Sequence, residues 1–338
     1  MKKLLSIFLC LFLLTGCAGS GEEARSSTRY LTAMDTVMTL TAYGKNREAA
    51  LDQAEAEIER LDGLLSVGNP DSEISRLNTS GTLTLSRDPA ALLGRALDLA
   101  RETGGLFDPT VYPLVKLWGF FDKNYHVPTG QELRDTLCLV GYEKLAFVPD
   151  TGLVTLGPGQ QIDLGGIGKG FASQSVTDLL RASGVTSALL SLGGNIQCLG
   201  TKPDGTPWNI GIRDPWNGDG TLYAAVKVTD KAVITSGGYE RYFEDPETGN
   251  IYRHILDPRT GAPAESGLSS VSIVTSDGAL GDGLSTALYI MGLSEAADFW
   301  RAHRESFDAI LIADDGTLYA TEGLRGSLSS QHEIHYIQ

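Results

Sequence analysis

Cysteine and histidine are scarce in this sequence. The 338 residues include five histidines and four cysteines, Cys10, Cys17, Cys138 and Cys198. No two cysteines have C-x-x-C spacing, and so few cannot form a disulfide scaffold or a cysteine-rich zinc site. Since no spacing supports a bridge or a metal site, we interpret Cys138 and Cys198 as buried free thiols.

Basic residues are outnumbered. Lysine and arginine total 27 against 42 acidic residues, which gives a net charge of −15. This charge argues against nucleic acid or an anionic lipid surface as a partner. A protein this acidic needs a bound cation or helix N-termini to hold a polyanionic nucleotide.

Long hydrophobic runs are also lacking, with one exception at the N-terminus. Two lysines precede an apolar run over residues 4–14, and Leu-Thr-Gly-Cys17 follows. The run is too short to span a bilayer as a mature helix, and its flanks are those of a secretory signal. Cys17 stands where a bacterial lipoprotein signal places its acylated cysteine. The alternative is an ordinary signal peptide in which this cysteine occurs by chance.

This pattern predicts three parts of the chain. Residues 1–16 are a signal peptide, residues 17–29 are a small, polar tether that carries the lipid on Cys17, and residues 30–330 form a folded domain of two intertwined halves. Removing the signal also removes Lys2 and Lys3, so the net charge moves from −15 to −17. We expect the protein at the extracytoplasmic face of a bacterial membrane, held by lipid.

Hydrophobic periodicity predicts an α+β fold. Helices are expected from Asn46 to residue 65, from Asp88 to the glycines at 104–105, and at 129–138, 171–183, 279–291 and 294–306. Strands are expected at 36–43, 152–157, 187–192, 208–213, 221–228, 231–235, 251–256 and 269–275, with a hairpin at 309–321. Most turns between strands are too short for crossover helices, which favours largely antiparallel sheets with flanking helices.

A glycine cluster follows the predicted strand at 152–157. The segment reads Asp163-Leu-Gly-Gly-Ile-Gly-Lys169-Gly-Phe. Glycine permits positive φ and close approach of backbone N–H groups to a phosphate, which Lys169 would neutralise. The spacing matches neither a Walker loop nor G-x-G-x-x-G. A tight turn from strand to helix without any ligand explains the same residues.

Asp282 and Thr286 lie four residues apart in a predicted helix. That spacing places the carboxylate and the hydroxyl on one helical face. Hard oxygen donors suit Mg²⁺ or Ca²⁺ and not zinc. The alternative is an acidic residue that stabilises the helix N-terminus beside a packed threonine.

His254 lies in the charged segment Arg253-His-Ile-Leu-Asp257-Pro-Arg-Thr-Gly. A histidine beside charged groups near a turn is a candidate general base, although most lone histidines are structural. Another loop, Leu106-Phe107-Asp108-Pro-Thr, leads to the aromatic segment 116–121. Its aromatic residues are candidates either for the core or for contact with a planar ring.

Together these segments resemble the FAD:protein FMN transferases of the ApbE family. The resemblance runs from Met34 to the 320s. It rests on eight motifs in order, which are Ala33-Met-Asp-Thr36, Pro70-Asp-Ser-Glu-Ile-Ser-Arg-Leu-Asn78, Gly105-Leu-Phe-Asp-Pro-Thr-Val111, Asp163-Leu-Gly-Gly-Ile-Gly-Lys-Gly170, Leu192-Gly-Gly-Asn195, Thr235-Ser-Gly-Gly-Tyr-Glu-Arg241, His254-Ile-Leu-Asp-Pro258 and Gly281-Asp-Gly-Leu-Ser-Thr286. Members often have glycine in place of Asp35, and many have an aromatic residue near Gly68.

The resemblance implies an enzyme that takes FAD as substrate and uses Mg²⁺. It would attach FMN to a Thr or Ser hydroxyl of an exported flavoprotein. The resemblance places Mg²⁺ on Asp282, Thr286 and the carbonyl of Gly166. It implies that His254 assists the hydroxyl of the acceptor protein. The implied FAD-binding residues are Met34, Leu106, Phe107, Asp108, Lys169 and Ile255. Hydrolysis of FAD to FMN and AMP, or flavin binding without turnover, are the alternatives.

Overall fold

The computed structural model describes residues 24–217 and 220–338. The signal peptide predicted at residues 1–16 and the acylation site predicted at Cys17 lie outside these ranges. Within them, no helix has both the length and the apolar composition that crossing a membrane requires.

A nine-stranded sheet is the centre of the fold. Its strands, in spatial order, are β1 (Ser26–Ala33), β2 (Thr36–Tyr43), β6 (Ser187–Leu192), β7 (Asn195–Leu199), β10 (Ala232–Gly237), β13 (Leu268–Thr275), β14 (Asp308–Ala313), β15 (Leu318–Thr321) and β17 (Ile334–Ile337). All neighbouring strands are antiparallel except β15 and β17. The predicted α+β class with largely antiparallel sheets is therefore confirmed.

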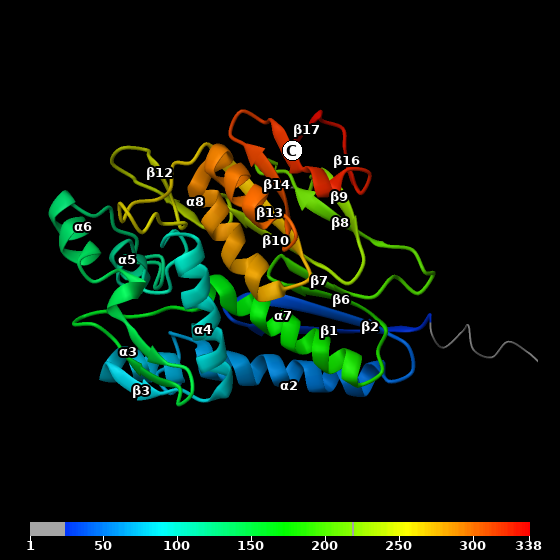
Figure 1. Cartoon of the computed structure of the whole chain (residues 1–338), viewed down its shortest axis with the longest axis horizontal. Coiled ribbons are helices and arrows are strands. Elements are labelled where there is room, and N and C mark those ends of the chain that lie inside the picture. The colour runs from blue at the N-terminus through cyan, green and yellow to red at the C-terminus, as the bar shows by residue number, and fades with distance from the viewer. Residues whose placement is uncertain (1–23, 218–219) are drawn as a thin grey trace, which may run out of the picture.

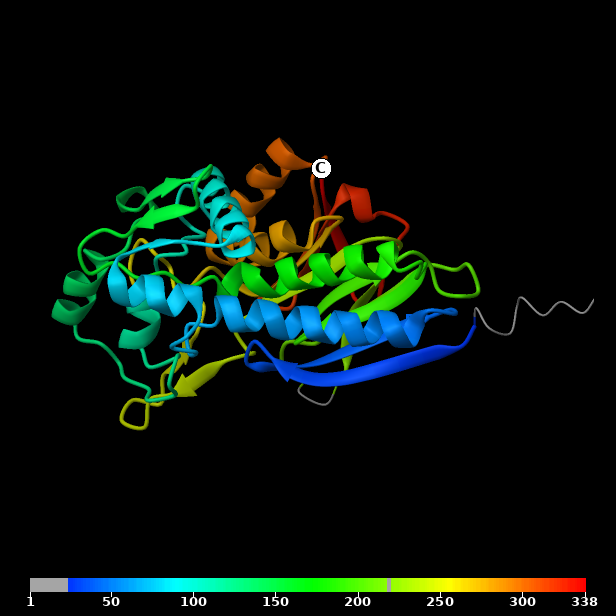
Figure 2. The ribbon, with the colours of Figure 1, turned by 90° about the horizontal axis from the view of Figure 1, so that it is seen from below.

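Three long helices pack beside the sheet (Figures 1 and 2). They are α2 (Arg47–Leu65), α7 (Gly165–Ala182) and α8 (Gly278–His303). Helix α7 contacts both α2 and α8, and α8 also contacts β10 and β13. The apolar stripe predicted in α2 is buried, which explains why this helix packs with that face inward. In α8, Gly292 with φ 73° separates the two helices expected from the sequence.

The remaining elements are short. The other helices are α3 (Glu73–Ser80), α4 (Arg87–Glu102), α5 (Tyr112–Leu117), α6 (Gly130–Leu137) and the 3₁₀ turns η1 (Tyr142–Lys144) and η2 (Glu322–Leu324). Three small sheets contain β3 (Thr82–Thr84), β5 (Leu153–Thr155) and β4 (Ala146–Val148); β16 (Leu328–Ser330), β9 (Leu222–Val228) and β8 (Trp208–Arg213); and β11 (Tyr242–Glu244) with β12 (Ile251–Arg253). Figure 1 shows α3, α5 and α6 at one end and β8, β9 and β16 toward the other.

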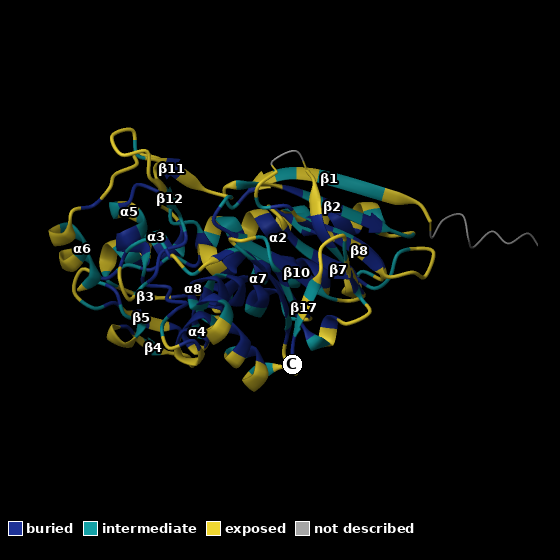
Figure 3. Ribbon diagram, turned by 90° about the horizontal axis from the view of Figure 1, so that it is seen from above, coloured by how far each residue is buried: buried dark blue, intermediate teal, exposed yellow. Residues whose placement is uncertain are grey.

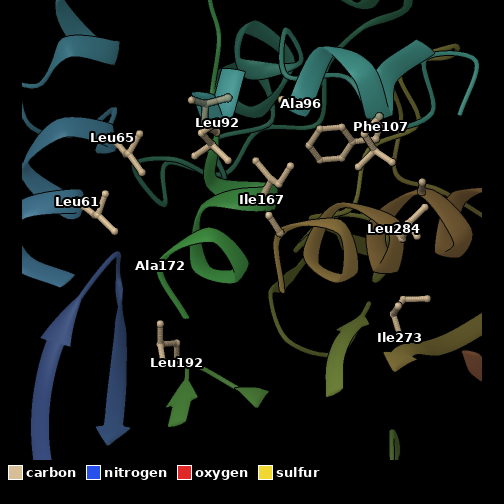
Figure 4. Packing of buried hydrophobic residues seen from close by; sticks show 14 of the residues in the cluster. Leu61, Leu65, Leu92, Ala96, Phe107, Ile167, Ala172, Leu192, Ile273 and Leu284 are labelled. Atoms are coloured by element: carbon tan, nitrogen blue, oxygen red, sulfur yellow. The ribbon is translucent and has the colours of Figure 1, made fainter. Parts of the chain in front are cut away.

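The largest hydrophobic core joins the helices to one another and to the sheet. Figure 4 shows Ile167 of α7 and Leu284 of α8 on the same side as Phe107, with Leu92 of α4 next to Ile167 and Leu65 of α2 farther along the same core. Buried residues gather around α7 and α8, while α6 at the edge has none (Figure 3). The segments 165–170 and 281–286 therefore lie on two helices with many buried residues.

The predicted domain limits need correction at both ends. Strand β1 begins at Ser26, within the predicted tether 17–29, and β17 ends at Ile337, beyond residue 330. The strand at the N-terminus was missed because its sequence is rich in Ser and Thr and borders the sheet, so it lacks a clear apolar alternation. Arg29 of β1 fixes it to α2 through ion pairs of 2.9 Å with Glu48 and 2.6 Å with Asp52.

One predicted helix start, one predicted capping contact and one predicted burial also differ from the structure. Helix α4 begins at Arg87 with Ser86 as its N-cap, so Asp88 is inside the helix. Asn46 does occupy the N-cap position of α2, but its side chain donates to the carbonyl of Ser183 instead of capping. Cys138 is exposed at the end of α6, whereas Cys198 is a buried free thiol as predicted.

Candidate active site

The predicted glycine loop is the start of a helix. Helix α7 begins at Gly165, six residues earlier than expected, and none of its glycines between 165 and 170 has positive φ. Their importance is close packing. A Cβ on Gly170 would lie 2.1 Å from the carbonyl oxygen of Gly278 and 2.7 Å from Cβ of Asp282. Glycine therefore lets the backbones of α7 and α8 touch where Asp282 lies.

Substitution of Gly170 tests this contact. We expect Gly170→Ala to destabilise the protein by about 3 kcal/mol, because backbone atoms of α8 cannot yield to the added methyl group. Gly168→Ala is the matched control, since its Cβ would meet nothing within 4 Å. Replacing this helical glycine should leave stability unchanged or raise it by up to about 1 kcal/mol. Urea unfolding measures both variants, and equal losses would contradict the packing argument.

Asp282 is held between the two helices. It is 5% exposed, and its Oδ2 accepts a hydrogen bond of 2.8 Å from the amide of Gly170. Its Oδ1 lies 3.8 Å from Nζ of Lys169. In a regular helix the Gly170 amide would donate to the carbonyl oxygen of Gly166. Here the amide donates to Asp282 instead, which leaves the carbonyl oxygen of Gly166 available to a ligand. The structure thus brings Asp282, Lys169 and the start of α7 together.

Thr286 follows Asp282 by one helical turn. Its half-buried hydroxyl lies 3.4 Å from Oγ of Ser236 on β10. Within the described residues, no three His, Cys, Asp or Glu side chains are grouped for a metal. One carboxylate with neutral oxygens is a donor set that fits Mg²⁺, which usually keeps several waters and takes further oxygens from phosphates. The residues present therefore fit the predicted cation.

His254 directly follows β12. Its Nδ1 lies 3.0 Å from the carbonyl oxygen of Arg241. A carbonyl only accepts, so Nδ1 carries the proton and the lone pair is on Nε2. Loss of solvation, with smaller contributions from the charges of Arg241 and Lys169, lowers the pKa of His254 to about 4. His254 is therefore a neutral base at physiological pH.

Further charged side chains lie near His254 and Lys169. The carboxylate of Asp163 accepts 2.8 Å from the amide of Gly165. Loss of solvation raises the pKa of Asp163, and the nearby charges of Lys169 and Arg241 oppose that rise. The predicted motif residues thus converge, although no role was predicted for Arg241. Its place in the motif 235–241 was the only available signal.

The predicted FAD-binding residues divide into two groups. Met34 and Asp35 form the turn between β1 and β2 with φ of 49° and 58°. Both angles favour glycine, and aspartate tolerates them better than methionine does, so the backbone strain falls mainly on Met34. The charge of Asp35 helps to raise the pKa of the Asp163 carboxyl. Met34 packs against the core, and Lys169 lies beside Asp282. This first group can contribute side chains to a ligand.

The second group is packed into the protein. Leu106, Phe107 and Ile255 are buried in the main core. The Asp108 carboxylate accepts from the amide and hydroxyl of Thr110 and from the amide of Tyr142, and loss of solvation raises its pKa. These side chains shape the loops around the site, so their contribution to a nucleotide would be backbone groups.

The aromatic segment after this loop is mostly core. Trp118 is buried and donates to the carbonyl of Gly261, and Phe120 is buried with Phe243. Phe121 instead is 41% exposed, and its ring lies 3.8 Å from where a Cβ on Gly68 would be. The space that an aromatic residue at position 68 would reach is therefore bordered by Phe121.

Comparisons with known proteins point in one direction. The model of the ApbE family matches residues 34–311. The chain is 32% identical to an FAD:protein FMN transferase of Treponema pallidum, with 95% of this chain and 93% of that protein covered. It is 33% identical to an FAD:protein FMN transferase of Klebsiella pneumoniae, with 82% and 87% covered.

Solved structures give the same result. The ApbE protein of Thermotoga maritima superposes with a TM-score of 0.84 at 28% identity, covering 90% of this chain and 99% of that chain. The flavin transferase ApbE of Vibrio cholerae has a TM-score of 0.79 at 28% identity, covering 89% and 99%.

Proposed function

Because this chain belongs to the ApbE family of flavinyltransferases, we propose that it transfers FMN from FAD to a hydroxyl of another protein. The acceptor is a Thr or Ser of an exported flavoprotein, the product is a phosphoester, and AMP leaves. The observation that carries this proposal is the placement of Asp282, Lys169 and Gly170 at one helix crossing. That arrangement suits a cation and a pyrophosphate together.

The residues of the chain divide the work of this transfer. The acceptor oxygen forms a bond to the FMN-side phosphorus, and the bond from this phosphorus to the bridging oxygen breaks. The bridging oxygen leaves with AMP and the electron pair. Nε2 of His254 takes the hydroxyl proton, for which its neutral state is required. Lys169 offsets negative charge on the pyrophosphate.

Asp282, Thr286 and the carbonyl of Gly166 would hold the cation. When bound there, Mg²⁺ supplies charge neutralisation to phosphate oxygens. Phosphoryl-type transfer needs positioning and charge stabilisation more than covalent chemistry from the enzyme. The rigid contact between α7 and α8 meets the first need, because it fixes the carboxylate relative to Lys169.

The surface beside His254 favours a polypeptide acceptor over water. The ring of Phe120 lies 6.5 Å from that of His254 and 5.9 Å from that of Tyr125. Tyr125 stacks on Phe243 at 4.7 Å, and a groove of about 640 Å³ runs between residues 125–127 and 243–247. Tyr125, Tyr242 and other apolar side chains here are exposed. Such a surface offers contacts to residues flanking the accepting hydroxyl.

One experiment separates transfer from the alternatives. Purified protein is mixed with FAD and Mg²⁺, with and without an acceptor flavoprotein domain. Transfer predicts AMP release together with yellow colour bound covalently to the acceptor. Hydrolysis predicts AMP and free FMN whether or not the acceptor is present, and a flavin-binding lipoprotein without turnover predicts no AMP.

The proposed site of action is the extracytoplasmic face of a bacterial membrane, with a lipid on Cys17. We expect Cys17→Ser to leave a soluble or unprocessed protein, because no described helix is long and apolar enough to cross a membrane. Cys10→Ser, in the apolar run of the signal, is the control and should still be anchored. Membrane fractionation after a high-salt wash is the measurement. If Cys17→Ser from which the signal has been cleaved remains in the membrane fraction, another anchor exists.

A further inference from the structure

A row of hydroxyl groups connects β10 to the proposed cation ligands on α8. Oγ of Ser285, which is fully buried, donates to the carbonyl oxygen of Asp282 at 2.7 Å. Oγ of Ser236 lies 2.8 Å from Oγ of Ser285 and 3.4 Å from Oγ1 of Thr286. The row therefore links Thr286 to the backbone of Asp282 through two serines.

The direction of every hydrogen bond in this row follows from its last member. A carbonyl oxygen can only accept, so Ser285 must use its single hydrogen on Asp282. Ser236 must then donate to Ser285, which uses the hydrogen of Ser236. Only Thr286 has a hydrogen left for the contact between Ser236 and Thr286.

We infer that Ser236 is a positioning residue that draws the hydrogen of Thr286 toward β10 and leaves the oxygen lone pairs of Thr286 for a divalent cation. This inference rests on the proposed Mg²⁺ site. A hydroxyl can bind a cation only through a lone pair, and a threonine in a helix commonly turns its hydrogen to the carbonyl one turn earlier. Here that carbonyl, of Asp282, already accepts from Ser285.

Ser236 lies on β10, and this strand packs against α8. Its neighbour Thr235 makes a separate 2.7 Å bond with Ser272 of β13. Successive side chains of a strand point to opposite faces, so Ser236 faces α8 and Thr235 faces away from it. Ser272 is therefore a matched control: it is a serine in the same sheet with a hydroxyl partner and no contact with Thr286.

Cation binding tests the inference without relying on activity. We expect Ser236→Ala to weaken Mg²⁺ affinity roughly tenfold to 100-fold, as losses of groups that orient metal ligands do. Affinity is measured by titration calorimetry with Mg²⁺ in the presence of FAD, and Mn²⁺ paramagnetic resonance serves as a second measurement. Ser272→Ala should leave the affinity unchanged. An unchanged affinity for Ser236→Ala, or equal losses in both variants, overturns the inference.

Two further variants distinguish orientation from general damage. Ser236→Thr keeps a hydroxyl on β10 and should retain cation affinity, while Ser285→Ala removes the group that sets the direction and should lower it. Asp282→Ala must lose the cation if the proposed site is correct. If Asp282→Ala loses the cation and Ser236→Ala does not, the role of Ser236 fails and the proposed function stands. If Asp282→Ala keeps the cation, the proposed metal site itself is wrong.

Discussion

Asp282→Ala is expected to abolish turnover. Among the residues that the structure describes, only the carboxylate of Asp282 contacts both Lys169 and the Gly170 amide at the crossing of α7 and α8. Without it, a cation would have only neutral protein oxygens, and affinity should fall at least about tenfold, the loss seen even for groups behind the ligands. The measurement is AMP release across a Mg²⁺ titration. Full activity of the variant at low micromolar Mg²⁺ would remove Asp282 from the metal site.

Two controls separate charge from structure. Asp282→Asn keeps the size of the side chain and an oxygen for the Gly170 amide, so it should fold normally and still lose turnover. Asp277→Asn removes a different acid at the start of α8. Asp277 caps the helix through the amide of Leu280, and asparagine caps equally well. This variant should keep activity.

Features that depend on local sequence could be predicted. The stripe of apolar residues in α2 repeats at helical spacing, and it is the buried face of that helix. Asp315-Gly316 predicted a hairpin, and Gly316 has the positive φ of 87° that the turn between β14 and β15 requires. Each of these signals lies within one element, so it needs no knowledge of the partner.

Features that depend on contact between distant segments could not be predicted. The glycines at 165–170 indicated a phosphate loop or a tight turn, but Gly170 is required by the backbone of Gly278 more than 100 residues away. The spacing of Asp282 and Thr286 placed both on one helical face, whereas Ser236 reaches Thr286 only because β10 lies against α8. A single sequence does not contain that register.

His254→Asn is expected to lower kcat on the order of 10²–10⁴-fold with little change in FAD affinity, because a general base acts in the transition state. The deficit should shrink as pH rises and the acceptor hydroxyl needs less help. His335→Asn is the control, since His335 is an exposed histidine of β17 and does not line the groove at residues 125–127 and 243–247. Fluorescence quenching of FAD and single-turnover AMP release measure the two steps separately.

The pH dependence follows from the pKa of about 4. His254 is neutral above this pKa, so its protonation should not lower kcat/KM of the native protein near neutral pH. kcat/KM should fall when the pH drops through about 4, because His254 then becomes protonated. The unfolded chain binds this proton near 6.5, so His254 also makes the fold less stable as pH falls from 6.5 to about 4. Both effects should be missing in His254→Asn.

A packed histidine without a catalytic role gives a different pattern. His254 precedes Ile255, which is buried in the main core, so loss of the bond from Nδ1 to the Arg241 carbonyl would disturb that contact and the shape of the site. FAD binding and stability would then fall, and the single-turnover rate of the bound complex would not. A general base affects the single-turnover rate, whereas a packed histidine affects FAD affinity and stability. Weaker FAD binding with an unchanged rate would therefore show that His254 supports the site without acting as its base.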